Sequence, residues 1–299
     1  MTIAIPTYQR AAQLRRAIES VLAQDYEPIE LIISDNASTD GTRELCEDYT
    51  ARHPSIQYVR QPANVGPTAN FQHLRPLAGG DYFMYLGDDD WLDPGYVSAC
   101  VASIEDNPGR SLVAGRVFYH GPDGVDPDAY PVDIEDVDPR RRVLRYCRGV
   151  RANGVFYGVV PTFLDRRVPV MRNVLGGDWL HVMALAYLGQ VHTLDEVVVH
   201  RTVGGTTVDL ANVAATLGLG WFPATAPQIA IAYAVFREIA VESPLYAGLG
   251  RRGRIWLGAR AGAILFLRFV PGAVVKFARL RAIGVVRRAQ ARPAPAQAP

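Results

Sequence analysis

Residues Tyr82–Pro94 read Tyr-Phe-Met-Tyr-Leu-Gly-Asp-Asp-Asp-Trp-Leu-Asp-Pro, an apolar, strand-like run that ends in three consecutive carboxylates, Asp88, Asp89 and Asp90. Carboxylates this close together repel one another and raise each other's pKa. A divalent cation removes that conflict, because carboxylate oxygens are its natural ligands. The alternative is a helix start, where an aspartate caps free N–H groups. Asp93 could cap such a helix alone, so the acid triplet before it favours a metal site.

Strand-like and helix-like segments alternate along the first part of the sequence, up to the acid triplet. Apolar, β-rich runs occupy residues 2–5, 29–34, 56–60 and 82–86. Segments with helical spacing or helix-capping residues separate them. This alternation predicts right-handed βαβ units, and therefore an α/β fold with a mainly parallel sheet flanked by helices.

Polar side chains follow the end of each predicted strand. In chain order they are Thr7 and Tyr8, Asp35, Asn64 and Gly66, and the acid triplet. Ligands of open parallel sheets bind beyond the carboxyl ends of the strands. We therefore expect these residues, which are far apart in the sequence, to converge on one crevice.

The sequence lacks the glycine-rich loops of common nucleotide-binding sheets. No G-x-G-x-x-G follows the first strand, and no G-x-x-x-x-G-K-[ST] occurs anywhere. A bound diphosphate would therefore be held in another way, and a metal on the acid triplet is the expected means.

Composition is that of a globular protein. The chain has 299 residues, of which 49% are hydrophobic, enough for a real core in one large domain or two. The three cysteines, Cys46, Cys100 and Cys147, are far apart and match no zinc or disulfide spacing, which predicts a reduced, cytoplasmic setting. We expect no signal peptide, because Met1 leads directly into a strand-like run.

The charge is divided unevenly along the chain. Residues 251–299 hold eleven Arg and Lys and no Asp or Glu, so the rest of the chain is acidic although the net charge is +1. The apolar run 255–267 contains Arg260 and is too short to span a membrane, so it fits a core helix or an interfacial helix. The basic residues at 276–292 suit either anionic lipid at the inner face of a membrane or solvent. Residues 291–299 are predicted to be disordered.

The middle of the chain carries weaker signals. The acid- and proline-rich residues 121–138 predict an exposed loop, and the arginines at 140–142 open a helix whose charges are expected to be solvated. Residues 154–162 look strand-like. Asp178 follows two glycines at the start of a helix, and it could be an N-cap or a site residue approached closely by a ligand. The glycine-rich loop 204–207 could close over a ligand or be an ordinary turn.

Five motifs occur in a fixed order: Ile-Pro-Thr-Tyr-Gln-Arg at 5–10, Ser-Val-Leu-Ala-Gln-Asp-Tyr at 20–26, Ile-Ser-Asp-Asn-Ala-Ser-Thr-Asp-Gly-Thr at 33–42, Asn-Val-Gly at 64–66, and the acid triplet. With them the chain resembles a family 2 glycosyltransferase with the Rossmann-like GT-A fold, over about residues 2–207. The resemblance implies a GT-A domain at 1–210, with a nucleotide-binding half at 1–95 and an acceptor half at 96–210. A helical, basic extension at 211–290 follows.

The resemblance also implies an activity. It is inverting transfer of a sugar from a UDP-, dTDP- or GDP-sugar to a hydroxyl of a glycan, a lipid-linked compound or a small molecule, with no nucleic acid partner. Mg²⁺ or Mn²⁺ is the implied cofactor. Two rivals stay open. A nucleotidyltransferase acting on sugar phosphates would typically carry a glycine-rich loop after the first strand. A non-catalytic nucleotide-sugar-binding protein would tolerate departures from the family's motifs.

Site residues follow by position from the resemblance. The implied nucleotide-binding residues are Pro6, Thr7, Tyr8, Arg10, Asp35, Asn64, Gly66, Asn70, Asp88 and Arg201, with Asp35 on the base. The family's proline lies four residues after its last acid, which places that acid at Asp90 and the metal ligand at Asp89. Asp90 is a second metal-ligand candidate. The family's usual first acid is replaced by Gly87.

The implied catalytic base is Asp178. The family has a Glu-Asp pair at the opening of a helix, and here the pair reads Gly177-Asp178. Arg201 and the loop after it match a segment that closes over the donor diphosphate. Some relatives have a metal-binding histidine two residues after that arginine, but here Val203 occupies the position and His200 precedes the arginine.

Overall fold

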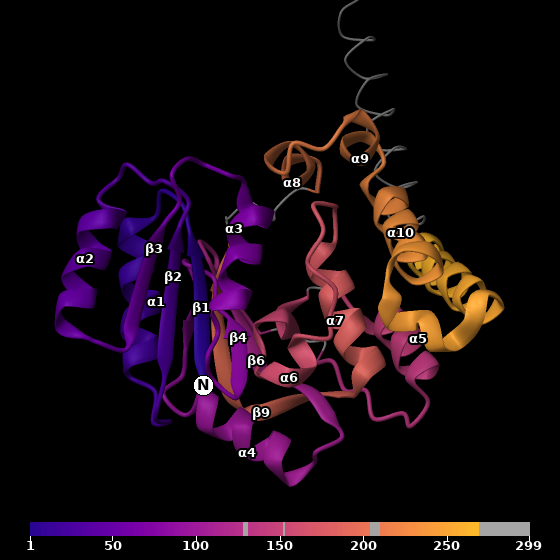
Figure 1. The fold of residues 1–299 in the computed structure, drawn as a ribbon, viewed down its shortest axis with the longest axis horizontal. Helices are drawn as coiled ribbons and strands as arrows, with labels where there is room; N and C mark the ends of the chain where they lie inside the picture. The colour runs from indigo at the N-terminus through magenta and orange to yellow at the C-terminus, as the bar shows by residue number, and fades with distance from the viewer. Residues whose placement is uncertain (128–130, 152, 204–209, 269–299) are drawn as a thin grey trace, which may run out of the picture.

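The computed structural model describes residues 1–127, 131–151, 153–203 and 210–268, and its chain folds around two β-sheets (Figure 1). The first sheet has the order β3-β2-β1-β4-β8. Its strands are β1 (Thr2–Thr7), β2 (Glu30–Asp35), β3 (Ile56–Arg60), β4 (Tyr82–Tyr85) and β8 (Val160–Pro161). The first four are parallel and β8 is antiparallel to β4, so the predicted parallel α/β sheet is present.

Successive side chains of the central strands point to opposite faces of this sheet, and each face packs into its own hydrophobic core. Ile3 and Ile5 of β1 pack with one core, together with buried residues of the helices α1 (Ala11–Leu22), α2 (Thr42–Arg52) and α4 (Tyr96–Asp106). Ala4 of β1 and Tyr85 of β4 face the other core, with α3 (Pro67–Leu74) and the C-terminal helices. A short 3-10 turn, η1 (Arg75–Leu77), follows α3. Both faces are covered, as the apolar strands require.

The second sheet has the order β5-β9-β6-β7. Its strands are β5 (Trp91–Leu92), β6 (Arg110–Gly121), β7 (Gly124–Pro127) and β9 (Gln190–Thr202). β6 and β9 run parallel, with an irregularity between Gly115 and Arg116. A Cβ at Gly115 would lie 2.3 Å from Val197 O, so only glycine allows β6 and β9 to approach at this point. β5 comes directly after the acid triplet and pairs antiparallel with β9, which ties the second sheet to the site.

Helices of the second half surround this sheet and continue beyond it. They are α5 (Pro139–Gly149), η2 (Gly154–Tyr157), α6 (Thr162–Asp165), α7 (Gly177–Leu188), α8 (Leu210–Thr216), α9 (Trp221–Thr225), α10 (Pro227–Arg237), the π-turn η3 (Glu238–Glu242), η4 (Pro244–Leu249) and a helix over residues 250–268. In the part of the chain that the structure describes, no helix has the length and apolarity needed to cross a membrane. Cys46, Cys100 and Cys147 are buried free thiols. The division into domains stays a prediction.

Several expectations for the middle of the chain are wrong. Within residues 121–138, β7 pairs with β6 as a hairpin instead of lying in a loop, although its residues are exposed as predicted. Residues 154–162 form a 3-10 turn and a two-residue strand rather than one strand. Arg142 is 8% exposed and donates to Ala186 O at 2.6 Å and Tyr187 O at 2.9 Å, so it is a buried link between α5 and α7 and not a solvated charge. The predicted loop 204–207 and tail 291–299 lie outside the described residues.

Candidate active site

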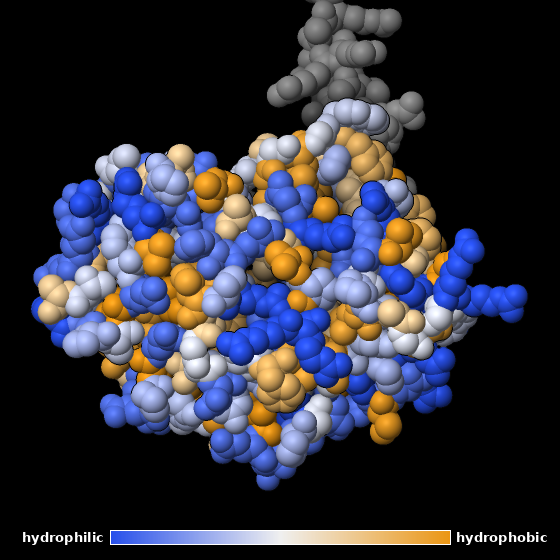
Figure 2. Space-filling model, viewed as in Figure 1, coloured by the Kyte–Doolittle hydropathy of each residue, from blue (hydrophilic) through white to orange (hydrophobic). Residues whose placement is uncertain are grey.

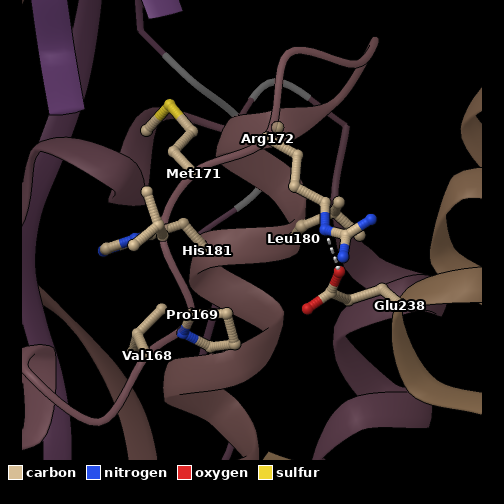
Figure 3. A pocket seen from close by; sticks show the side chains of 9 residues that line it. Val168, Pro169, Met171, Arg172, Leu180, His181 and Glu238 are labelled. Atoms are coloured by element: carbon tan, nitrogen blue, oxygen red, sulfur yellow. Dashed lines mark ion pairs between the residues drawn. The ribbon is translucent and has the colours of Figure 1, made fainter. Parts of the chain in front are cut away.

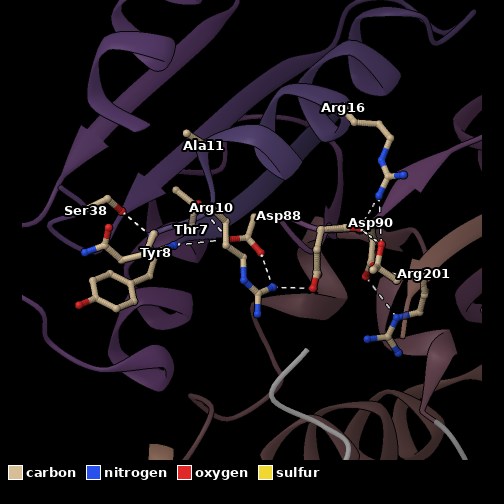
Figure 4. A network of polar contacts seen from close by, with 12 residues as sticks. Thr7, Tyr8, Arg10, Ala11, Arg16, Ser38, Asp88, Asp90 and Arg201 are labelled. Atoms are coloured by element: carbon tan, nitrogen blue, oxygen red, sulfur yellow. Dashed lines mark hydrogen bonds and ion pairs between the residues drawn. The ribbon is translucent and has the colours of Figure 1, made fainter. Parts of the chain in front are cut away.

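The three carboxylates of the acid triplet follow β4 and have different partners (Figure 4). Thr7 Oγ1 donates to Asp88 Oδ2 at 2.9 Å, and Arg10 Nη1 donates to Asp88 Oδ1 at 3.1 Å. The same Arg10 nitrogen contacts Asp89 Oδ2. The end of β1 and the residues after it therefore supply a hydroxyl and a cation to the first two acids.

The third acid, Asp90, is held by the end of β9. Arg201 Nε donates to Asp90 Oδ2 at 3.2 Å, and Thr202 N donates to Asp90 Oδ1 at 3.2 Å. Thr202 Oγ1 also donates to Asp89 O at 2.7 Å. Asp90 is 1% exposed, so its charge is balanced inside the protein by Arg201.

Burial raises the pKa of two of these carboxyls. The pKa of Asp88 and of Asp90 is raised to about 6, with burial as the main cause and the charge of Asp89 adding to it. Arg10 opposes the shift at Asp88, and Arg201 opposes it at Asp90. An opposite charge placed beside such carboxylates favours their charged forms.

Gly87 occupies the position of the family's first acid, and the structure gives a steric reason for it. A Cβ at Gly87 would lie 2.6 Å from Asp90 Oδ2 and 3.3 Å from Asp89 Oδ1. No side chain fits there while Asp90 is turned toward Arg201. Glycine at position 87 therefore leaves room for the ion pair between Asp90 and Arg201.

Arg16 of α1 is a site residue that the sequence analysis did not single out. Its Nη2 donates to Asp89 O at 3.2 Å and to Thr202 Oγ1 at 3.0 Å. Its guanidinium carbon lies 3.5 Å from the centroid of the Trp91 ring, a cation–π distance. Arg16 thus joins α1, the acid loop and the end of β9. In the sequence Arg16 is one of two adjacent arginines on a helix, and this pattern does not indicate a site residue.

His200 belongs to a separate cluster. Its Nε2 lies 3.0 Å from Asp93 Oδ1, and its Nδ1 lies 2.9 Å from His120 Nε2. Its ring stacks on Trp91 with centroids 5.0 Å apart. The Asp93 side chain therefore bonds to β9. The prediction that Asp93 caps a helix is wrong, because the N-cap of α4 is Gly95.

Pro6 and Tyr8 lie at the end of β1. Pro6 is buried in the strand, whereas Tyr8 is 43% exposed and its backbone N lies 3.4 Å from Asp88 Oδ2. Gln9, next in the chain, has a φ of 57° and donates from N to Ser38 Oγ at 2.9 Å. This turn leaves the Tyr8 side chain exposed, and an exposed aromatic ring can stack on a flat ligand ring.

Asp35, the residue predicted to bind the base, is fully buried at the end of β2. Ser38 N donates to Asp35 Oδ1 at 2.8 Å and Tyr58 OH donates to Asp35 Oδ2 at 2.8 Å. Arg60 Nε lies 3.4 Å from the same Oδ2. Both oxygens have protein partners that shape the turn after β2. A contact with the base stays a prediction.

Asn64, Gly66 and Asn70 organise the entry to α3. Asn64 Oδ1 accepts hydrogen bonds from Asn36 Nδ2 and Gly66 N, both at 2.9 Å. Gly66 has a φ of 84°, which only glycine adopts easily. Asn70, 2% exposed, donates from Nδ2 to Ser34 O at 2.9 Å. These residues fix the loops at the ends of β2 and β3, Asn70 from a buried position and Asn64 from an exposed one.

Asp178 lies in the first turn of α7. Asn153 Nδ2 donates to Asp178 Oδ2 at 2.9 Å, and Tyr146 OH donates to Asn153 Oδ1 at 2.7 Å. Burial raises the pKa of Asp178, and the hydrogen bond from Asn153 and the charge of Arg201 oppose this shift. The alternative of a helix cap is wrong, because Gly176 is the N-cap. A carboxylate with a raised pKa and a fixed orientation suits a proton acceptor.

Arg201 connects the two parts of the site. Its Nε binds Asp90, its charge acts on Asp178, and its guanidinium carbon lies 4.7 Å from the centroid of the Tyr157 ring. A second link joins the start of α3 to the end of β1, because Asn70 Nδ2 lies 3.4 Å from Thr7 O. Together, the contacts of Arg201 and Asn70 bring residues from the ends of β1, β2, β4 and β9 close to the start of α7.

Comparison with known proteins decides the family. The family model described as Glycosyl transferase family 2 matches residues 2–159, more than half of the chain. The chain belongs to glycosyl transferase family 2. The matched region includes β1, the acid triplet and all of β6, and it ends before α7 and β9.

Curated relatives of this family 2 member cover it in part. An uncharacterized protein of Mycobacterium tuberculosis is 30% identical over 201 residues, 66% of this chain and 56% of the relative. A GalNAc(5)-diNAcBac-PP-undecaprenol beta-1,3-glucosyltransferase of Campylobacter jejuni is 31% identical over 117 residues, 39% of this chain and 37% of the relative. An abequosyltransferase of Salmonella typhimurium is 40% identical over 95 residues, 31% of this chain and 28% of the relative. The chain thus spans little more than half the length of the first of them.

Solved structures share the fold. The S. aureus TarS structure in complex with UDP-GlcNAc has a TM-score of 0.56 at 14% identity, over 86% of this chain and 78% of that one. The mannosyltransferase of Pyrobaculum calidifontis in complex with GDP-Man and Mn²⁺ has a TM-score of 0.52 at 16% identity, over 95% and 80%. The predicted GT-A fold is confirmed.

One of these solved neighbours contains Mn²⁺, and the acid triplet of this chain has the carboxylates of one kind of cation site. Over the described residues, no three or more His, Cys, Asp and Glu side chains are grouped so as to enclose a metal. Magnesium sites shared with substrate phosphates, however, need only one or two carboxylates. The side chain of Asp89 is 19% exposed, against 11% for Asp88 and 1% for Asp90. Asp89 is therefore the acid best placed for a cation shared with a diphosphate.

Three cavities lie near α7. One is lined by Val168–Arg172, Gly177, Leu180, His181 and Glu238, and Arg172 Nε in its wall lies 3.0 Å from Glu238 Oε2 (Figure 3). Its volume of about 10 Å³ is at the size of one water molecule. A second, of about 240 Å³, is mostly apolar and lies between α7, α9 and α10. A third, also of about 240 Å³, is lined by Tyr85 of β4, His181 of α7 and residues of α3 and η1. The acid triplet lines none of them.

Proposed function

We propose that this protein is an inverting glycosyltransferase that moves a sugar from a nucleotide-diphosphate donor to an acceptor hydroxyl. One observation carries the proposal: Arg201 pairs with Asp90 of the acid triplet and also acts electrostatically on Asp178. A diphosphate beside the triplet and a hydroxyl beside Asp178 would then meet at one anomeric carbon. The membership of glycosyl transferase family 2 supports the reaction class.

The transfer is a single displacement. The acceptor oxygen attacks the anomeric carbon from the face opposite the diphosphate, and the bond from that carbon to the diphosphate oxygen breaks. The acceptor proton passes to Asp178, which is held for this purpose by Asn153. General-base help of this kind is typically worth about 10²–10⁴-fold. The transition state has oxocarbenium character, as in glycoside hydrolysis.

Asp89, with Asp90, is the proposed holder of Mg²⁺ or Mn²⁺, which would stabilise charge on the leaving diphosphate. Arg10 already balances Asp88 and Asp89. Arg10 and Arg201 stand on the two sides of the triplet, so both are placed to bind diphosphate oxygens. Thr7 and Tyr8 complete this wall of the proposed nucleotide site.

The donor and acceptor are proposed by class. Structural neighbours contain UDP-GlcNAc or GDP-Man, which supports a UDP-, dTDP- or GDP-sugar donor. The acceptor is a glycan, a lipid-linked compound or a small molecule with a free hydroxyl. A cytoplasmic location is proposed with it, and the buried free thiols fit that setting.

The test is a screen of nucleotide sugars with Mn²⁺ that measures release of the nucleoside diphosphate. Wild-type protein should release it slowly even without an acceptor. Asp178→Asn should bind the donor normally in calorimetry and lose nearly all transfer, and Asp123→Asn, an exposed acid outside the site, should behave as wild type. Normal turnover by Asp178→Asn would remove Asp178 from the mechanism. Release of pyrophosphate would instead identify a nucleotidyltransferase, and binding without release a non-catalytic protein.

A further inference from the structure

The helix over residues 250–268 is apolar on two opposite faces. Its inner face packs against α10 and is buried at Leu257, Ala261 and Leu265. The backbones approach closely, since a Cβ at Gly262 would lie 3.0 Å from Ala232 O of α10. The inner face is therefore fully used by the protein. Among the residues that the structure describes, the outer face of this helix is the one left open to a partner.

The outer face carries a second apolar stripe. Its members recur at three- and four-residue intervals and are exposed: Ile255, Trp256, Ala259, Ala263, Phe266 and Leu267. Trp256 is 46% exposed and Leu267 is 67% exposed. Figure 2 shows one face of the molecule, on which apolar and polar side chains are mixed over the C-terminal helices. The outward face of a helix in a soluble domain is normally polar, so this outer stripe indicates a contact surface.

Arginines border the outer stripe. Arg252 and Arg260 are exposed, and the guanidinium carbon of Arg260 lies 4.9 Å from the centroid of the Trp256 ring. The sequence from 251 to 299 adds nine more basic residues and no acid. This charge complements an anionic surface. A second copy of the chain fits poorly, because a two-fold contact through the stripe would bring arginines together.

We propose that the outer stripe docks the protein on an anionic membrane surface, with the helix lying in the plane of the interface. Trp256 and Phe266 would enter the boundary between headgroups and acyl chains, and Arg252 and Arg260 would bind lipid phosphates. The helix lies flat because its inner face stays packed on α10. This docking does not depend on the proposed transfer reaction, so it is tested separately.

The experiment is co-sedimentation of the full chain with phosphatidylcholine vesicles that contain or lack phosphatidylglycerol. Wild type should pellet with the anionic vesicles alone. Trp256→Ser/Phe266→Ser should weaken binding about tenfold or more through lost apolar burial. Arg252→Gln/Arg260→Gln should weaken it about fivefold for each arginine. Val137→Ser removes a side chain that is 92% exposed and outside the stripe, and it should pellet as wild type.

The outcomes separate the alternatives. Thermal unfolding at the wild-type temperature shows that each variant is folded. Wild type that stays in the supernatant overturns the proposal. So does a Trp256→Ser/Phe266→Ser variant that pellets as wild type, because the basic segment after the helix would then bind alone. A dimer in sedimentation velocity that this variant dissociates would make a second copy the partner instead.

Discussion

Arg201 Nε lies 3.2 Å from Asp90 Oδ2, and this ion pair joins residues that are 111 positions apart. The Asp90 side chain is 1% exposed and that of Arg201 is 20% exposed. Removing one partner of a buried pair leaves the other charge without compensation. The integrity of the acid loop therefore depends on the end of β9, which also carries Thr202 onto Asp90.

Arg201→Ala should destabilise the protein, because Asp90 would be left buried and unpaired. The expected loss is on the order of 3 kcal/mol in the free energy of unfolding. Urea denaturation measures it. Arg43→Ala is the control, since Arg43 forms an exposed pair with Glu47 whose loss should leave the free energy of unfolding almost unchanged. Equal losses for the two variants would show that the Asp90 pair adds nothing to stability. Asp90→Asn should restore part of the stability lost in Arg201→Ala.

Gly87→Ala should distort the acid loop, because the added Cβ would lie 2.6 Å from Asp90 Oδ2. Asp90 would be pushed off Arg201, at a cost of about 1–3 kcal/mol. Affinity for a nucleoside diphosphate with Mn²⁺ should fall as well, and both are measurable by thermal unfolding and calorimetry. Gly149→Ala is the matched control, since no atom lies within 4 Å of its added Cβ. If Gly87→Ala kept wild-type stability and affinity, the steric account of this glycine would be wrong.

The first sheet was predictable because its signals are local. Each strand from β1 to β4 is an apolar run of four to six residues, and the helices between them have amphipathic or capping patterns. The acid triplet and Thr7 were predicted to share a crevice from the geometry of parallel sheets, and they are joined by a hydrogen bond.

The rest of the site depends on tertiary packing that local patterns do not encode. The sequence predicts that Arg142 is a solvated charge and does not single out Arg16, yet Arg142 is buried against α7 carbonyls and Arg16 reaches the acid loop. Asp93 resembles a helix cap next to a proline, but β9 uses it through His200. In each case a charged side chain binds a partner that the pairing or packing of distant elements has brought near.

Metal binding should depend steeply on pH. Burial raises the pKa of Asp88 and Asp90 to about 6, above the ordinary value of 3.8. Their charged forms therefore destabilise the metal-free fold above pH 6, and this destabilisation is relieved as the pH falls from 6 toward 4. A bound cation favours the same charged forms, so Mn²⁺ with UDP should raise the unfolding temperature more at pH 7.5 than at pH 5. Asp89→Ala should lose most of the pH 7.5 shift. A shift of the same size in this variant would exclude Asp89 as a ligand.

The rate of transfer should report the environment of Asp178. A general base acts only when deprotonated, and burial raises the pKa of Asp178 above the ordinary 3.8. The acidic limb of kcat/KM against pH should therefore lie above the pH at which an exposed aspartate titrates.

Asn153 provides the matched test, because its hydrogen bond to Asp178 Oδ2 lowers that pKa. Asn153→Ala should move the acidic limb to higher pH and lower the rate at neutral pH, while donor affinity is unchanged. Tyr146→Phe, which removes the donor to Asn153 Oδ1, should move the limb less, since the bond from Asn153 to Asp178 remains. If the limb stayed in place in Asn153→Ala but moved in Asp89→Asn, it would belong to the metal site and not to the base.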